Sequence, residues 1–344
     1  MKRTDARHGR AASPAAARDT AAPRRRSRLG RSGVAVLAAM CAVTAVASLT
    51  LTGCTRGTDR PHPTSPLAKA ERTQRIPELT YAEDLRISDA EQHLVKQCMA
   101  RHGYRFWEER TLTLEESRPV GYVQDDVHWA RMYGYGSRIM AKEDRARVRN
   151  PNLAYRTSLP TARQSTYDTA LDGGRTATLL KIKAPGGGTI TKRSGGCTGE
   201  AEKKLYGDPT TWFRTDTTVS NLRPLYVGKL LRDKEFGGAV RDWSRCMRRA
   251  GHPYRDPNEA RQATREHGTP QNRAAEARTF AAETRTATAD AGCARAASLK
   301  SIGKEREAHY VGELSAAYGD ALDTYRRLKR AALAHAEQIV PARA

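Results

Sequence analysis

Cysteines at four positions lie in two repeated motifs, and this pattern constrains the fold more than any other feature of the chain. Cys98 and Cys246 each open a C-M-x-x-x-G segment, whereas Cys197 and Cys293 each lie in a G-C-x-x-x-A segment. The two motifs therefore alternate along the chain, and each occurs twice. Two copies of one helical unit, each closed by its own disulfide, would produce this order.

The first 53 residues have the pattern of an export signal. Residues 1–31 carry ten basic and two acidic side chains, and residues 33–51 form a run without a charge. A basic segment followed by an apolar segment is typical of a secretory signal peptide. The run ends in Leu51-Thr52-Gly53-Cys54, which resembles the lipobox of bacterial lipoproteins. The resemblance implies that residues 1–53 are removed and that Cys54 carries a diacylglyceryl group and an acyl chain such as palmitate.

Two questions about this leader stay open from the sequence. Its uncharged run is nearly as long as a membrane-spanning helix, which needs about 20 apolar residues, so an uncleaved anchor is the alternative. Arg25 and Arg26, followed by Leu29, resemble a twin-arginine signal, although no phenylalanine precedes the leucine. The export route, general or twin-arginine, is therefore left open.

An exported chain meets an oxidising compartment, in which an even number of cysteines favours disulfides. Four cysteines allow three connectivities, and the order of the motifs selects Cys98–Cys197 and Cys246–Cys293. Each disulfide would close a long loop and would stabilise the folded state by about 4–5 kcal/mol.

A metal site is the alternative use of such cysteines. The chain has no C-x-x-C motif, and exported cysteines pair with each other more often than they bind metal. His102 and His252 follow predicted helix ends, where an imidazole is a surface or capping residue. The sequence therefore predicts no metal and no cofactor.

Composition divides the remaining chain into a linker and two units. Segment 54–85 begins with the lipidated cysteine and is rich in proline and polar residues, so it buries too little apolar surface to fold. We expect a flexible tether there, a first helical unit at 86–225 and a second at 226–344. The expected fold is mainly α, with two disulfide-clasped helical units, a small β-hairpin in the first and a long C-terminal helical hairpin.

Capping residues and hydrophobic spacing place the helices. Residues 88–91, Ser-Asp-Ala-Glu, form a capping box that would open the first helix. Further helices are expected at about 235–249, 270–300 and 304–337. In the last of these, apolar residues recur at alternating spacings of three and four, as a packed seam requires, at Val311, Leu314, Tyr318, Ala321, Tyr325, Leu328 and Ala332.

One segment interrupts the helical pattern. Residues 176–183 alternate loosely between apolar and polar side chains, and glycines at 186–188 separate them from Thr-Ile-Thr at 189–191. This pattern predicts a β-hairpin. A phosphate-binding loop is the alternative, but no G-K-[ST] sequence follows the glycines.

This layout of motifs resembles a large set of uncharacterised actinobacterial lipoproteins. Those proteins carry a W-x-x-C-M-x-x-x-G segment, which here runs from Trp243 through Cys246 to Gly251, and an A-D-x-x-C helix, here Ala289 to Cys293. The resemblance covers about 90–335. It implies an envelope location and paired cysteines, and it implies no activity.

The chain is strongly basic. Its net charge is +22, and because the leader holds ten basic and two acidic residues, +14 stays with the mature part. Together with an extracytoplasmic location, this charge makes anionic cell-wall polymer, lipid headgroups or an envelope protein the nearest partners. We expect no nucleic acid as a partner, because no basic block with interleaved aromatic residues occurs in the mature chain.

The most suggestive polar cluster is Asp125, Asp126 and His128, flanked by aromatic residues. Two carboxylates and an imidazole can bind a metal or transfer a proton. Adjacent carboxylates in a strand or turn point apart, however, so a structural role is the alternative. No sequence signature of a serine hydrolase, zinc protease, P-loop or dinucleotide-binding protein occurs in the chain.

Three hypotheses of function follow. The first, which requires least, is a membrane-anchored extracytoplasmic module that binds a polymer or protein of the cell envelope. The second is an envelope hydrolase that uses the acidic residues around Asp125–His128. The third is a solute-binding lipoprotein of a transporter, which would need strand-rich lobes that the sequence does not predict. Whether the protein is an enzyme stays open, and the pattern favours that it is not.

Overall fold

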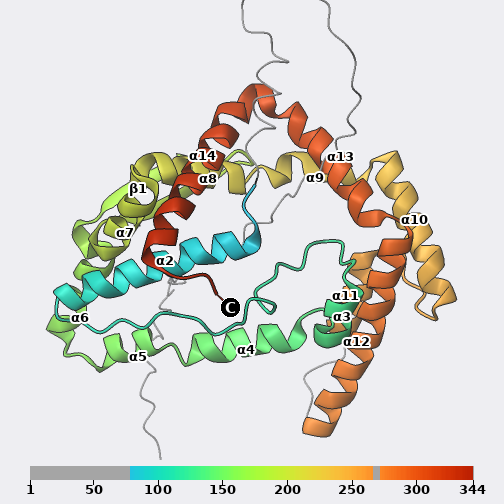
Figure 1. Cartoon of the computed structure of the whole chain (residues 1–344), viewed down its shortest axis with the longest axis horizontal. Helices are drawn as coiled ribbons and strands as arrows, with labels where there is room; N and C mark the ends of the chain where they lie inside the picture. Colours follow the sequence, from blue (N-terminus) through green and yellow to red (C-terminus); the bar gives the residue numbers. More distant parts are fainter. Residues whose placement is uncertain (1–77, 266–271, 344) are drawn as a thin grey trace, which may run out of the picture. The chain divides into compact units, whose positions relative to one another are not determined.

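The computed structural model describes residues 78–265 and 272–343 (Figure 1). The predicted signal peptide, the lipobox with Cys54 and most of the predicted tether lie outside these residues. Within them, no helix combines the length and the apolar character that crossing a membrane would require.

The described part of the chain is mainly α, as predicted, with a single two-stranded sheet among its elements. In chain order the elements are α2 (Tyr81–Arg101), α3 (Val127–Tyr133), α4 (Ser137–Val148), α5 (Pro151–Ser158), α6 (Thr161–Asp172), the 3-10 turn η1 (Gly174–Thr176), β1 (Thr178–Lys183), β2 (Thr189–Ser194), α7 (Gly196–Tyr206), α8 (Pro209–Ser220), α9 (Arg223–Leu231), α10 (Lys234–Arg249), α11 (Pro257–Arg265), α12 (Arg273–Ala296), α13 (Leu299–Glu313) and α14 (Ser315–Ile339).

Helix α2 begins upstream of the predicted capping box. Thr80 is the N-cap: its hydroxyl accepts a hydrogen bond from the Glu83 N–H, and the Glu83 carboxylate accepts one from the Thr80 N–H at 2.6 Å. The prediction that residues 88–91 open this helix is wrong. The capping box at Thr80 begins the helix, and residues 88–91 lie inside it. Asp89 is instead buried at 1% exposure, and its Oδ2 accepts a hydrogen bond from Arg343 Nε at 2.6 Å.

The first hydrophobic core lies among α2, α7, α8 and α14, which pack side by side (Figure 1). Its fully buried side chains include Ile87, Met99 and Leu205. The predicted Cys98–Cys197 disulfide is confirmed; it joins α2 to α7 with a Cα–Cα distance of 5.5 Å.

The second hydrophobic core lies among α10, α11, α12 and the beginning of α13. Helix α10 spans Lys234–Arg249, within one residue of the prediction, and its Trp243 and Met247 side chains are completely buried. The predicted Cys246–Cys293 disulfide is also confirmed; it joins α10 to α12 with the same Cα–Cα distance of 5.5 Å.

The predicted β-hairpin is confirmed. Strands β1 and β2 are antiparallel, with Ile182 opposite Ile190. The Ala184 N–H donates to the carbonyl of Gly188 at 3.0 Å, and Gly187 and Gly188 have positive φ angles of 96° and 79°. Glycine is favoured at such positions because it has no Cβ to clash with the backbone, which explains the glycines at the turn.

The C-terminal helical region is divided differently from the prediction. The helix expected at 270–300 ends at Ala296, and Ser298 then has a left-handed φ of 50°. The single helix expected at 304–337 is two helices, because α13 ends at Glu313 and α14 begins at Ser315. Helix α13 packs on α9 and α10, whereas α14 packs on α2, α7 and α8.

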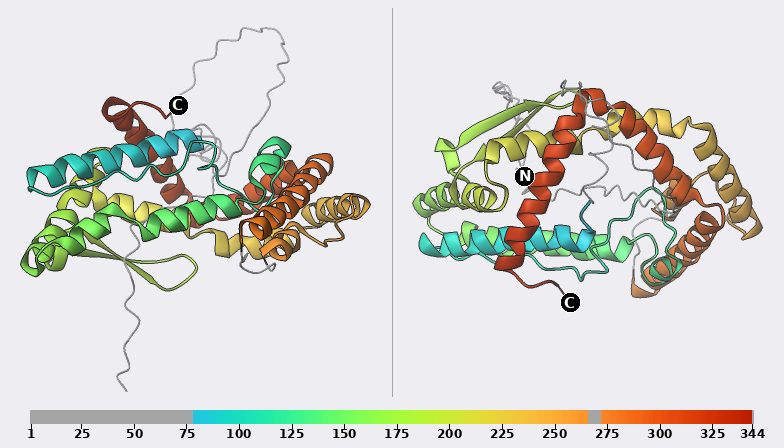
Figure 2. Two further views of the ribbon diagram at one scale, coloured as in Figure 1. Left: turned by 90° about the horizontal axis from the view of Figure 1, so that it is seen from below. Right: turned by 45° about the horizontal axis from the view of Figure 1, so that its top comes forward.

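Each core contains a segment from the other half of the sequence. Ala332, Leu333 and Ala336 of α14 are buried in the first core, and α14 crosses α2 in both Figure 1 and Figure 2. In the opposite direction, Tyr122 and Val123 from the first half pack against the second core, and α3 packs along α12 beside it. Packing therefore connects the predicted units 86–225 and 226–344 in two places.

Candidate functional site

Asp126, one of the predicted site residues, caps the N-terminus of α3. Its Oδ1 accepts a hydrogen bond from the Trp129 N–H at 3.0 Å, and its Oδ2 accepts one from Arg118 Nη1 at 2.8 Å. The backbone N–H of Trp129, together with the Arg118 guanidinium, holds the pKa of Asp126 below its usual range. Both carboxylate oxygens of Asp126 are therefore occupied by structural contacts.

Asp125 and His128 do not join Asp126 at a common point. The Asp125 carboxylate pairs with Lys300 of α13, and its backbone carbonyl accepts a hydrogen bond from Arg295 at 2.9 Å. His128 lies on α3 with its side chain exposed. The structure thus assigns the two carboxylates to different partners, as expected for adjacent residues that point apart.

Helix α3 is held close to α12 by small and aromatic side chains. Ala130, Ala287 and Ala291 are completely buried between the two helices. The loop after α3 is fixed by Glu283 of α12, whose carboxylate accepts hydrogen bonds from the N–H groups of Tyr135 at 2.7 Å and Ser137 at 3.2 Å. Because alanine side chains are small, the two helices can approach closely at this contact. Their packing then fixes which residues of α3 and α12 lie next to each other at its edge.

An open depression of about 430 Å³ lies where α3 meets α12. It is lined by Arg131, Thr284, Arg285, Thr288 and Ala289. The two arginines have exposed side chains, and neither forms an ion pair with a carboxylate within 78–265 or 272–343.

The hydroxyl groups at the depression are used within α12 itself. Thr284 Oγ1 donates to the Ala281 carbonyl at 3.1 Å, and Thr288 Oγ1 donates to the Thr284 carbonyl at 2.6 Å. The guanidinium groups of Arg131 and Arg285 are therefore the donors that an incoming ligand would meet. Such groups bind phosphate and carboxylate through paired, charge-assisted hydrogen bonds.

A buried carboxylate of α12, Asp290, connects this helix to α10 and to the loop after α3. Asp290 is completely buried, and its Oδ1 and Oδ2 accept hydrogen bonds from Trp243 Nε1 at 2.8 Å and the Tyr135 hydroxyl at 3.0 Å. Burial raises the pKa of Asp290 to about 6, although the Arg261 guanidinium and the two hydrogen bonds oppose the rise. The sequence motifs contained both Trp243 and Asp290, but their contact was not predicted.

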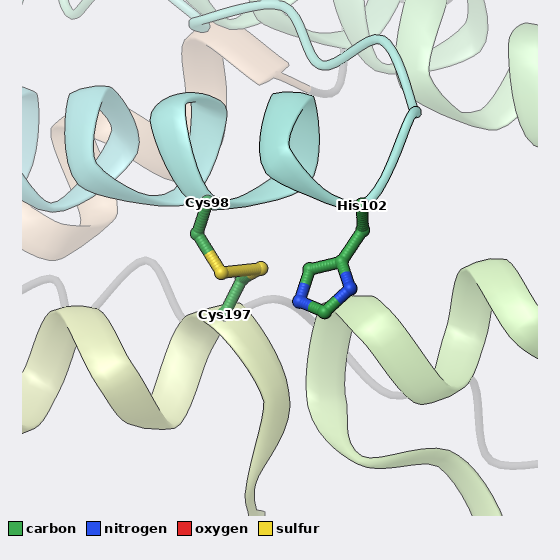
Figure 3. A group of neighbouring side chains, drawn as sticks. All are labelled: Cys98, His102 and Cys197. Atoms are coloured by element: carbon green, nitrogen blue, oxygen red, sulfur yellow. A yellow bond between two sulfur atoms is a disulfide. The ribbon is translucent and has the colours of Figure 1, made fainter.

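One group of potential metal ligands occurs among the described residues. Sγ of Cys98, Sγ of Cys197 and a ring nitrogen of His102 lie within 4.8 Å of one another (Figure 3). His102 is the C-cap of α2, the helix-end position expected from the sequence, and the cysteines are joined as a disulfide. The proximity of the imidazole to the sulfur atoms was not predicted.

Comparisons of the chain with protein-family models, with curated proteins and with solved structures found no match.

Proposed function

We propose that this protein is a lipid-anchored module on the extracytoplasmic face of a bacterial cell membrane, where it binds an anionic polymer of the envelope. The two disulfides support this location, because such bonds form and persist in oxidising compartments. The Leu51-Thr52-Gly53-Cys54 sequence supports anchoring through lipid on Cys54.

The observation that carries the binding role is the pair of arginines at the α3–α12 depression. Arg131 and Arg285 come from different helices, line the same depression and lack a carboxylate partner in the described part of the chain. The depression is open, which suits a repeating phosphate polymer that passes across the surface better than a small solute that must be enclosed.

Binding of a poly(glycerol phosphate) chain to the purified mature protein tests the proposal. We expect Arg131→Ala/Arg285→Ala to weaken binding about tenfold or more, because charge-assisted hydrogen bonds contribute about 1.5–3 kcal/mol each. The matched control is Arg241→Ala/Arg249→Ala, which removes the same charge from exposed positions on α10. An equal loss in both variants would assign binding to diffuse charge, and no binding by the wild type would refute the polymer as the ligand.

Neither alternative function has an observation in its favour. A hydrolase would require the carboxylates around Asp125–His128 to act on one point, and Asp125 and Asp126 instead pair with Lys300 and Arg118. A solute-binding lipoprotein would require strand-rich lobes, and the described chain has a single hairpin. We therefore adopt the binding module.

A further inference from the structure

Three side chains with metal-ligand chemistry converge at the first disulfide, and the Glu200 carboxylate lies beside one of them, outside the group of three. The His102 ring lies beside the bond between Cys98 and Cys197 (Figure 3), with the donor atoms of these three residues within 4.8 Å of one another. In addition, Oε2 of Glu200 is 3.4 Å from Sγ of Cys98, while Oε1 of the same carboxylate accepts a hydrogen bond from Arg101. A disulfide sulfur has no proton to donate, so the bonded cysteines give Glu200 Oε2 no hydrogen bond.

The second copy of the repeat has the same clasp without these ligands. The position of His102, four residues after the motif cysteine, is occupied by Ala250, and the position of Glu200, three residues after the other cysteine, is occupied by Ala296. The local backbone is alike in the two copies. His102 and Ala250 are both helix C-caps, each is followed by a glycine with positive φ, and both disulfides have a Cα–Cα distance of 5.5 Å. Closing the clasp therefore does not require an imidazole or a carboxylate.

We propose that, once the Cys98–Cys197 disulfide is reduced, the two thiolates and His102 bind one divalent cation of the zinc class, and that the Glu200 carboxylate rotates from its place beside Cys98 to become the fourth ligand. A dithiol reductant supplies two electrons and two protons and becomes a disulfide itself, which leaves two cysteine thiols. The cation then displaces both thiol protons as the metal–sulfur bonds form.

Two thiolates, an imidazole and a carboxylate are a ligand set that suits zinc and its analogues. In a tetrahedral site with metal–sulfur distances of about 2.3 Å, the two sulfur atoms would lie roughly 3.8 Å apart, a separation that rotation about the Cα–Cβ bonds can provide. The cation would join α2 to α7 in place of the disulfide, so the first core would stay clasped in both redox states. The second core has no such alternative.

Cobalt binding tests this proposal. The protein is the full chain in detergent with Cys41→Ser and Cys54→Ser, which leaves only the four framework cysteines as thiols. It is reduced with a phosphine under argon, titrated with Co²⁺ and followed by the thiolate-to-cobalt charge-transfer absorption. We expect one Co²⁺ per reduced chain, none per oxidised chain, and displacement by Zn²⁺. His102→Ala and Glu200→Ala should each weaken binding about tenfold or more.

Introducing the two ligands beside the second disulfide provides a test that leaves the residues around the first disulfide unchanged. Ala250 and Ala296 are exposed, so Ala250→His/Ala296→Glu introduces both ligands at the equivalent positions beside Cys246–Cys293. We expect the stoichiometry to rise from one Co²⁺ to two. Absence of binding by the reduced parent would overturn the proposal. So would binding that is insensitive to both His102→Ala and Glu200→Ala, because thiols of an unfolded chain would behave in that way.

Discussion

At the scale of single residues, the most consequential contact joins the two repeated cysteine motifs. Trp243 lies three residues before Cys246, and Asp290 lies three residues before Cys293, so each has the same helical face as its cysteine. The Trp243 indole donates to the Asp290 carboxylate inside the second core, next to the disulfide. The residues of the W-x-x-C and A-D-x-x-C patterns therefore join α10 to α12 in two ways. Trp243 and Asp290 form a hydrogen bond, and Cys246 and Cys293 form a disulfide.

Removing the Asp290 carboxylate should be strongly destabilising. Asp290→Ala leaves the Tyr135 O–H buried without an acceptor and leaves the Trp243 N–H only the backbone carbonyl of residue 290, at 3.3 Å; an unsatisfied buried group costs about 1–3 kcal/mol. We expect the free energy of unfolding, measured by denaturant titration, to fall by about 3 kcal/mol. The control Asp242→Ala removes a half-exposed carboxylate from α10 and should change it by less than about 1 kcal/mol. A similar small effect of Asp290→Ala would contradict this account.

Glu91 of α2 should make stability depend on pH. Burial, and then the nearby Glu202 carboxylate, raise the pKa of Glu91 to about 7, against the opposing effect of Lys192 and Lys329. A raised carboxyl pKa means that the folded state holds the proton more tightly than the unfolded state. Stability is therefore highest below the ordinary pKa of 4.5, falls as pH rises from 4.5 to about 7, and stays low above that.

The substitution Glu91→Gln separates this effect from other titrations. We expect unfolding curves of the wild type to lose on the order of 3 kcal/mol across this range through Glu91, and the variant to lack that loss. Asp290 adds a separate decline up to about pH 6 that remains in the variant. The control is Glu235→Gln, which changes an exposed carboxylate on α10. If the pH dependence of stability is the same in Glu91→Gln as in the wild type, Glu91 does not cause the loss of stability.

At the scale of elements, the two disulfides differ in the length of chain that they close. Cys98–Cys197 spans 99 residues and Cys246–Cys293 spans 47. The chain-entropy model gives stabilisations of about 4.7 and about 4 kcal/mol. We expect Cys98→Ser/Cys197→Ser to lower the free energy of unfolding somewhat more than Cys246→Ser/Cys293→Ser, as measured by denaturant titration. The reverse order would mean that local strain or residual structure outweighs loop length.

Much of the secondary structure could be predicted from local patterns. The disulfide pairing followed from the repeat, α10 from its apolar face, and the hairpin from its glycines. The division between α13 and α14 was missed because the spacing of apolar residues continues through Leu314 without interruption. The apolar residues before and after Leu314 contact two different sets of helices. The spacing of apolar residues along the sequence does not show whether they pack against one set of helices or two.

The candidate site was predictable only in part. The sequence identified Asp125, Asp126 and His128 as a polar cluster but predicted no helix there, and the structure places these residues at the beginning of α3. It could not identify the depression, because Arg131 and Arg285 are far apart in sequence and each looks like an ordinary surface arginine. Only the packing of α3 on α12 brings them together.

At the scale of the whole molecule, neither half of the described chain completes its own core. The first core includes Ala332, Leu333, Ala336 and Val340 from the C-terminal end, all buried. Helix α3, from the first half, covers α12 in the second. We therefore expect the described part to unfold in one cooperative transition rather than as two independent units.

Cutting the chain at the predicted unit boundary tests this cooperativity. A fragment of residues 78–225 lacks α14, so the apolar faces of α2, α7 and α8 would be exposed, and we expect it to be poorly folded by circular dichroism and amide exchange. Addition of a peptide of residues 315–343 should restore protection. A fragment that folds fully without the peptide would show that the first unit is independent of α14.

The claim on which the functional account rests is that the mature protein begins at a lipidated Cys54 and faces an oxidising compartment. Mass spectrometry of intact protein and of non-reduced peptides, from the membrane fraction of the native host, measures this directly, with Cys54→Ala as the control. We predict an acylated N-terminal Cys54 and linked peptides for Cys98–Cys197 and Cys246–Cys293 in the wild type, and loss of the lipid in the variant. An unprocessed leader, or cysteines recovered as free thiols, would contradict the account.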